Sequence, residues 1–202
     1  MSQVTARQDL IERATHSTSP DELATLATHE DPEIRAAVAR NPLVNPDTID
    51  ELAFDDDWRV RAAAAVNTAT GSFSLGELTR DDDVRVRERV ARHTGLSLKD
   101  MERVFGDDDG RVRAAASANP AAPEAALDRA SSDAHWQVRA AVAANPSCSM
   151  VLLRTLATDD DWRVRAAVAG NPATPAEVLA ALVLDGDAGV RDAAVRPAET
   201  AK

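Results

Sequence analysis

The amino-acid sequence predicts an all-α solenoid built from tandem copies of a 26-residue unit. Three observations indicate this fold. A β-branched residue followed by arginine recurs every 26 residues, with no insertion between copies. Aromatic residues are only 3% of the 202 residues, while alanine dominates the 44% that are hydrophobic. No strand pattern competes with the helical spacing. Small side chains let helices approach closely, which favours many thin layers over one thick core.

The recurring pair sets the register of the expected repeats. We call its first residue the anchor, and the pairs are Ile34-Arg35, Val60-Arg61, Val86-Arg87, Val112-Arg113, Val138-Arg139, Val164-Arg165 and Val190-Arg191. This register predicts a single repeat domain over residues 1–202. It comprises a degenerate capping repeat at 1–33, six repeats at 34–189, and a half-repeat with a polar tail at 190–202.

A first helix of about ten residues is expected around each anchor. Aspartates ahead of the anchor, such as Asp57, Asp83, Asp109 and Asp161, can cap its N-terminus and favour the positive end of the helix dipole. In one copy, Val164, Ala167, Val168 and Asn171 have the spacing of a buried helical stripe. The helix is expected to end at Asn171-Pro172, because the residue before proline is pushed out of the α region.

A second, shorter helix is expected to complete each unit. Thr174-Pro175-Ala176-Glu177 reads as a capping box with proline at the first helical position, and Ser19-Pro20-Asp21-Glu22 reads in the same way. We expect Leu179 and Leu182 to be buried on this helix. A single 26-residue unit buries too few side chains to offset the entropy of ordering it, so stability must come from neighbouring units.

Residues 164–187 read VRAAVAGNPATPAEVLAALVLDGD, and this pattern resembles the leucine-rich repeat variant family. Similar units cover about residues 9–195. The resemblance implies a right-handed α-solenoid in which α-helices alternate with short helices of 3₁₀ type, so the second helix is expected to be α or 3₁₀. Some members carry a cysteine cluster for an iron-sulfur centre ahead of the repeats. No iron-sulfur cluster is expected here, because the only cysteine is Cys148.

Two questions stay open at this point. Short HEAT-like repeats share the acidic turn, the Val-Arg pair and the alanine-rich helix, although their helix pairs need longer units. The second question concerns residues 67–110, where Asn67-Thr68 and His93-Thr94 replace Asn-Pro and the connecting regions contain Gly71, Gly76, Gly95 and Gly106. These irregular repeats are either a bend that shapes a binding surface or the result of drift.

Composition disfavours several function classes. The formal net charge of −11 repels phosphate backbones and anionic membrane surfaces, so nucleic acid and membrane are poor partners. No apolar stretch approaches about 18 residues, no export signal is visible, and a single cysteine suits a reducing compartment, so a cytoplasmic location is expected. Four scattered histidines and the lack of a phosphate loop or nucleophile elbow predict no catalytic, cofactor or metal site. The acidic runs match helix caps better than a calcium loop.

The charged and aromatic residues in register have two interpretations each. The arginines after the anchors can form a ladder for an acidic ligand, or they can bond to the acidic turn or carbonyls of an adjacent unit. Trp58, Trp136 and Trp162 share one position, and they can be interaction hot spots or can cover the adjacent layer. The structural interpretation is the better supported one in both cases.

Outward positions on the first helix are expected one residue before the anchor and two and six residues after it. They include Arg59, Ala62 and Val66 in one copy, and the locally basic stretch from Arg85 to Arg92 in the next. The candidate partner-binding residues are Arg85, Arg89, Arg92, Arg111, Trp58, Trp136 and Trp162. The sequence thus predicts a non-enzymatic scaffold that binds a protein or peptide. The alternatives are a HEAT-like nucleic-acid binder and a structural spacer in an assembly.

Overall fold

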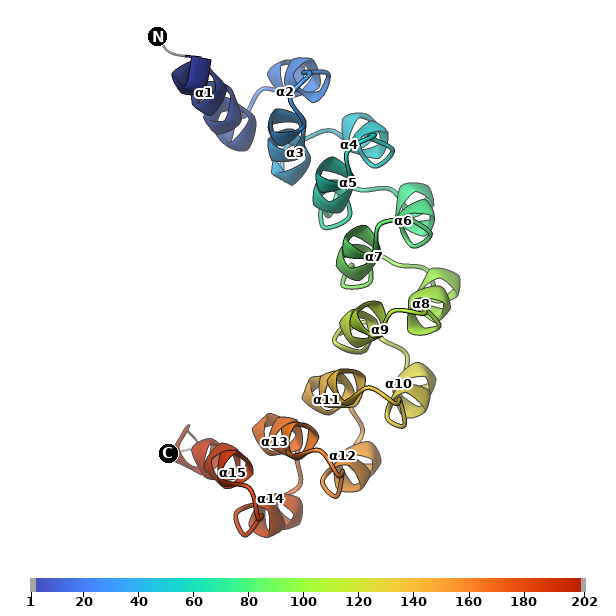
Figure 1. Ribbon diagram of the computed structural model, residues 1–202, viewed down its shortest axis with the longest axis vertical. Coiled ribbons are helices and arrows are strands. Elements are labelled where there is room, and N and C mark those ends of the chain that lie inside the picture. Colours follow the sequence, from blue (N-terminus) through green and yellow to red (C-terminus); the bar gives the residue numbers. More distant parts are fainter. Residues whose placement is uncertain (1–2, 201–202) are drawn as a thin grey trace. The chain divides into compact units, whose positions relative to one another are not determined.

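A computed structural model describes residues 3–200 of the chain, and all its regular secondary structure in that range is α-helical (Figure 1). The chain divides into two compact units, Met1–Asp100 and Met101–Lys202. The boundary falls within one helix, α8 (Leu98–Phe105). The single domain over 1–202 stays a prediction, and residues 1–2 of the predicted cap and 201–202 of the predicted tail lie outside the described residues.

The first unit consists of seven helices and the start of an eighth. They are α1 (Gln3–His16), α2 (Pro20–Ala27), α3 (Pro32–Arg40), α4 (Pro46–Leu52), α5 (Trp58–Ala64), α6 (Ser72–Leu78), α7 (Val84–Val90) and α8 (Leu98–Phe105). The second unit continues with α9 (Gly110–Ser117), α10 (Glu124–Ala130), α11 (Trp136–Ala144), α12 (Met150–Leu156), α13 (Trp162–Gly170), α14 (Ala176–Leu182) and α15 (Ala188–Thr200).

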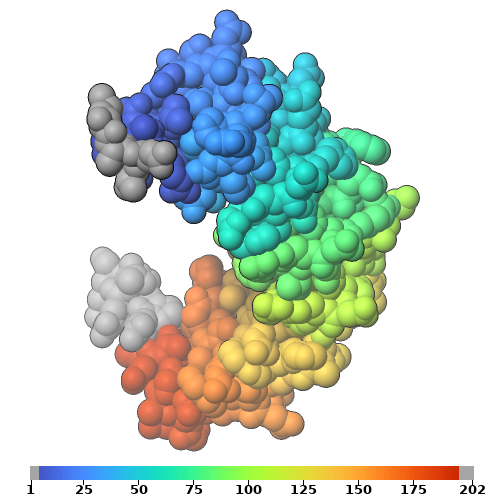
Figure 2. Space-filling view, turned by 45° about the horizontal axis from the view of Figure 1, so that its top comes forward, coloured from blue at the N-terminus to red at the C-terminus, as the bar shows by residue number. Residues whose placement is uncertain are grey.

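The helices of each unit form two rows (Figure 1). The odd-numbered helices from α3 to α15 contain the anchors, and we call them the first helices; the even-numbered ones are the second helices. Each first helix begins two residues before its anchor, so the predicted 26-residue period is confirmed. Within each unit, successive first helices pack on one another more extensively than successive second helices do. In the space-filling view the sequence colours follow one another in bands within each unit (Figure 2).

Local sequence explains where the helices start. Asp57 caps α5 by accepting a hydrogen bond from the backbone N–H of Arg59, and Asp83, Asp109 and Asp161 do the same for their helices, as predicted. The first helices between α3 and α13 have seven to nine residues, slightly fewer than expected. The second helices are α-helical throughout the described residues, which decides between the α and 3₁₀ alternatives.

The capping prediction for the second helix is right in one copy and wrong in another. Ser19 accepts from the N–H of Glu22, with Pro20 as the first helical residue. In the last full repeat, however, α14 begins after Pro175 and has no side-chain cap. The hydroxyl of Thr174 instead donates to the carbonyl oxygen of Val168 at 2.6 Å, where it satisfies the end of the preceding helix.

The core of each unit consists of small buried side chains that pack between successive repeats. All seven anchor side chains are 0% exposed. Leu182 is buried as predicted, but Leu179 is only half-buried, and Val178 takes the buried place beside it. Leu153, one repeat earlier than Leu179, is fully buried. The difference arises because α14 is the last second helix of the described residues, so its outer flank has no neighbour.

Candidate interaction surfaces

Five of the arginines that follow the anchors bind a carboxylate of the next repeat. Arg139 donates through Nε and Nη2 to both carboxylate oxygens of Asp159, at 2.7 and 2.8 Å, in the following repeat. Its Nη1 donates to the carbonyl oxygens of Asp133 and Ala134. The same carboxylate fork is formed by Arg35, Arg61, Arg113 and Arg165. This arrangement agrees with the structural interpretation of the arginine row, since these guanidinium groups are already occupied.

The acidic turns serve the same stack. Asp159 accepts from Arg139 and also from the N–H of Asp161, while Asp161 caps α13. The bond from the Arg139 guanidinium holds the pKa of the Asp159 carboxyl below its usual value. Asp160, between them, has an exposed side chain and accepts from Arg165 through its backbone carbonyl. Among the described residues no group of three or more potential ligands could hold a metal ion.

A ladder of buried asparagines, which the sequence reasoning missed, connects the same repeats. Asn145 Nδ2 donates to the carbonyl oxygens of Ser117 and Asn119 in the preceding repeat, at 2.7 and 2.9 Å. Asn41, Asn67 and Asn171 bind backbone carbonyls one repeat earlier in the same way. The signal was present in the Asn-Pro motif, but it was interpreted only as a helix end. Each asparagine therefore donates to carbonyl groups at and just after the end of the first helix of the preceding repeat, where intrahelical donors run out.

Two of the candidate tryptophans, Trp58 and Trp136, lie against an arginine of the following repeat. The Arg85 guanidinium carbon is 3.4 Å from the centroid of the half-buried Trp58 ring. Arg163 lies over Trp136 of the preceding repeat, at 4.6 Å, and over Trp162, its own neighbour in sequence, at 5.0 Å. Trp162 is 42% exposed, and the residue that would cover it in the next repeat is a glycine. A contact between a tryptophan and an arginine of the next repeat is a cation–π contact that holds the two layers together. This agrees with the interpretation in which the tryptophans cover the adjacent layer.

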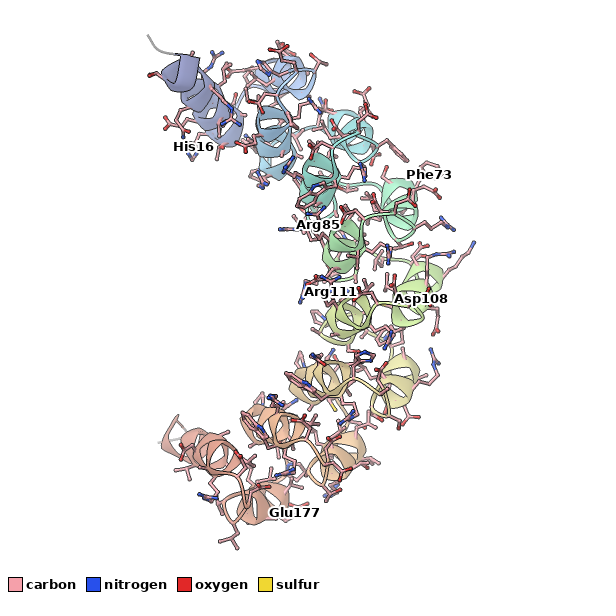
Figure 3. All side chains as sticks on the ribbon, viewed as in Figure 1. His16, Phe73, Arg85, Asp108, Arg111 and Glu177 are labelled. Atoms are coloured by element: carbon pink, nitrogen blue, oxygen red, sulfur yellow. The ribbon has the colours of Figure 1, made fainter. Side chains whose placement is uncertain are left out.

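The basic stretch on α7 is partly neutralised within the first unit. Arg85 binds the carboxylate of Asp83, and Arg92 binds Glu88. The Arg85 bond holds the pKa of Asp83 at about 2. Arg89 is exposed and makes no ion pair with the described residues. Arg85 lies on the first-helix side of its unit (Figure 3).

The remaining candidate arginine belongs to the other unit. Arg111 is exposed on the first-helix side of the second unit (Figure 3), where it binds Asp109. The structure therefore brings Arg85 and Trp58 together in one unit, while in the other unit Trp136 and Trp162 each contact Arg163. Ala62, expected to point outward, is only 3% exposed because the alanine-rich helices pack closely around it.

A pair of exposed aromatic residues on the opposite side of the first unit was not predicted. Phe73 on α6 is 73% exposed, and Phe54, just after α4, is 55% exposed. Their ring centroids are 6.2 Å apart with an angle of 35° between the planes, which is within the range of an attractive aromatic contact. Phe73 faces outward from the second-helix side, as Figure 3 shows. The two residues occupy different positions of the repeat, so the period does not reveal them.

Phe54 also lines a cleft between the turns that follow α4 and α6. This cleft has a volume of about 440 Å³. It is lined by Leu78, by the Arg61–Asp81 ion pair and by Arg80, which is paired with Glu77. We call this cleft together with Phe73 the Phe54–Phe73 groove.

Two remaining features concern chemistry and membranes. Burial raises the pKa of the Cys148 thiol to about 11, so this cysteine is not poised as a nucleophile at neutral pH. The side chain is only 4% exposed. No helix among residues 3–200 is both long and apolar enough to cross a membrane.

Comparisons with known proteins agree with the repeat geometry. The sequence profile of the family described as leucine rich repeat variant matches residues 162–187. A solved structure described as a leucine-rich repeat variant with a novel repetitive protein structural motif is 23% identical, with a TM-score of 0.60, over 96% of this chain and 82% of the other. Two engineered proteins are each 20% identical over 98% of this chain, with TM-scores of 0.25, and cover 92% and 89% of their own lengths. No curated protein matches the chain.

These findings define the class of protein. Stacked helix pairs with a 26-residue period make the protein an α-helical repeat solenoid. Within this class, one repeat matches the leucine rich repeat variant profile, and the fold resembles that of a solved structure described as a leucine-rich repeat variant over nearly the whole chain. The resemblance predicted from VRAAVAGNPATPAEVLAALVLDGD is confirmed.

Proposed function

We propose that this protein is a non-enzymatic scaffold that binds another protein or a peptide through the exposed face of its repeats. The periodic polar residues support this proposal because they are used within the stack. Arginines, aspartates and asparagines of the ladders bind the neighbouring repeat. What is left for a partner is the set of exposed positions that differ from copy to copy, as is usual for repeat proteins.

The observation that carries the proposal is the exposed aromatic pair. The rings of Phe54 and Phe73 form a tilted aromatic contact, and each residue is more than half exposed. Large exposed apolar groups that adjoin one another mark interaction sites more often than isolated ones do. Aromatic side chains are also favoured at the centres of interfaces. A purely structural spacer has no need of such a pair.

The nucleic-acid alternative has weaker support. Two of the candidate cations, Arg85 and Arg92, already bind carboxylates of their own unit. The net charge of −11 adds a repulsive field around the whole chain. A cytoplasmic location stays a prediction that depends on the single, buried Cys148.

Affinity capture from native lysate tests the scaffold function. The full chain, a Phe73→Ser variant and an Arg85→Glu/Arg92→Glu variant are immobilised beside an unrelated protein of similar charge. We expect at least one protein to be recovered above the unrelated control and to be lost with one of the two surface variants. Recovery identical to that of the unrelated protein would reject the scaffold function. Nucleic acid retained in a salt-dependent way would support the alternative instead.

A further inference from the structure

We propose that the Phe54–Phe73 groove binds a peptide segment in which an aromatic or branched aliphatic side chain is flanked by lysine or arginine. This inference rests on the proposed scaffold function and adds the site and the chemistry of the partner. Its basis is an aromatic platform, a cleft beside it, and two carboxylates that form no ion pair with the described residues.

The groove differs from its counterparts in the other repeats. Clefts at the corresponding inter-repeat position occur in the second unit, one lined by Gly106 and another by Ser131 and Ser132. Gly106 and Ser132 occupy the repeat position of Phe54. The cleft itself is therefore a feature of stacking, since it recurs. Phe105 also lines one of these clefts, but it is half-buried and packs against the core. Among the described residues the exposed aromatic pair belongs to the first unit, and it supplies the apolar surface that an inserted side chain would cover.

Charge determines the kind of segment that fits. Five carboxylates and two guanidinium groups line the cleft, so the formal charge of its lining is −3. Arg61 and Arg80 are paired with Asp81 and Glu77, and Asp55 is held by Arg35 of the preceding repeat. That leaves Asp56 and Asp82, which are exposed and form no ion pair with the described residues.

Asp56 and Asp82 lie in the two successive turns that bound the cleft. A partner with cationic side chains on both sides of an apolar residue would meet both carboxylates while the apolar residue contacts Phe54 and Phe73. Complementary charges of this kind set specificity and association rate, whereas the aromatic contact supplies most of the affinity. An acidic or uncharged apolar segment would leave the two aspartates unpaired.

The chain offers a matched control for each change. Val151 occupies the repeat position of Phe73 in the second unit and is 70% exposed, so Val151→Ser controls for Phe73→Ser. Asp160 occupies the position of Asp56 and Asp82, so Asp160→Asn controls for Asp56→Asn/Asp82→Asn. None of these side chains is buried, and the backbone carbonyls of the three aspartates remain available to the arginine ladder. We therefore expect every variant to keep the thermal midpoint of the wild type.

A displayed library of random dodecapeptides, panned against the full-length protein, tests the proposal. The most enriched peptides are then measured by fluorescence anisotropy at low and high salt. We expect them to contain an apolar residue flanked by lysine or arginine. Phe73→Ser should weaken their binding by at least about fivefold, as expected for truncation of a central aromatic residue. Asp56→Asn/Asp82→Asn should weaken binding at low salt and reduce its salt dependence, whereas Val151→Ser and Asp160→Asn should change neither.

The possible failures separate the two proposals. Enriched peptides that lack basic residues, or that bind Phe73→Ser as tightly as Val151→Ser, would overturn the groove assignment and leave the scaffold function standing. Enrichment no greater than against an unrelated protein would overturn both.

Discussion

Removing one asparagine of the ladder tests how strongly the stability of one repeat depends on the next. Asn145 is 1% exposed, and Asn145→Ala removes its hydrogen bonds to the carbonyl oxygens of Ser117 and Asn119 and the bond that its Oδ1 accepts from the N–H of Ser147. Each contributes about 1 kcal/mol net, and the carbonyl of Ser117 at the end of α9 would be left unpaired at a cost of about 1 kcal/mol more. We expect a loss of about 3 to 4 kcal/mol in the free energy of unfolding.

Urea unfolding of the full chain, followed by far-UV circular dichroism, measures this loss. Met150→Ala is the control, because Met150 begins α12 only a few residues away and is 58% exposed. We expect the control to stay within about 0.5 kcal/mol of the wild type. If Asn145→Ala were equally mild, water would be replacing the amide, and the ladder would not hold the repeats together.

Three further predictions follow from burial and charge. Leu153→Ala should cost about 2 to 5 kcal/mol and Leu179→Ala clearly less, because only Leu153 is fully buried; equal losses in urea unfolding would contradict this. Arginine bonds hold the pKa of Asp159 below its usual value and that of Asp83 at about 2. Their stabilisation is therefore complete above the unfolded-state pKa of about 3.9 and is lost as the pH falls through the folded values, so the thermal midpoint should drop steadily between about pH 5 and pH 2; a constant midpoint would exclude this linkage. Because burial raises the pKa of Cys148 to about 11, iodoacetamide should alkylate it far more slowly in the native protein than in urea at neutral pH, and similar rates would show that the thiol is accessible.

The sequence was informative wherever a feature recurs in register. Seven anchors, the capping aspartates and the arginine row could be predicted because each is visible in several copies, and one helical interpretation explains them all. The asparagine ladder could not be derived in the same way. Asn145 and its acceptors lie 26 to 28 residues apart, so their contact exists only once the repeats are stacked. The half-burial of Leu179 also depends on stacking, because the position is buried in Leu153 and loses cover only at the last second helix.

The same distinction separates structural contacts from candidate binding surfaces. Arg85 and Trp58 were predicted as binding residues, but Arg163 and Trp136 form the same contact in the second unit, again one repeat plus one residue apart. A contact that recurs with the period is explained by stacking, so it needs no partner. The stacked pair formed by Phe54 and Phe73 occurs once in the part of the chain that the structure describes, and it leaves both rings exposed. The departures from the period near residues 67–110 therefore matter most where they place large apolar groups in solvent, and Phe73 is the residue whose substitution separates binding from folding most cleanly.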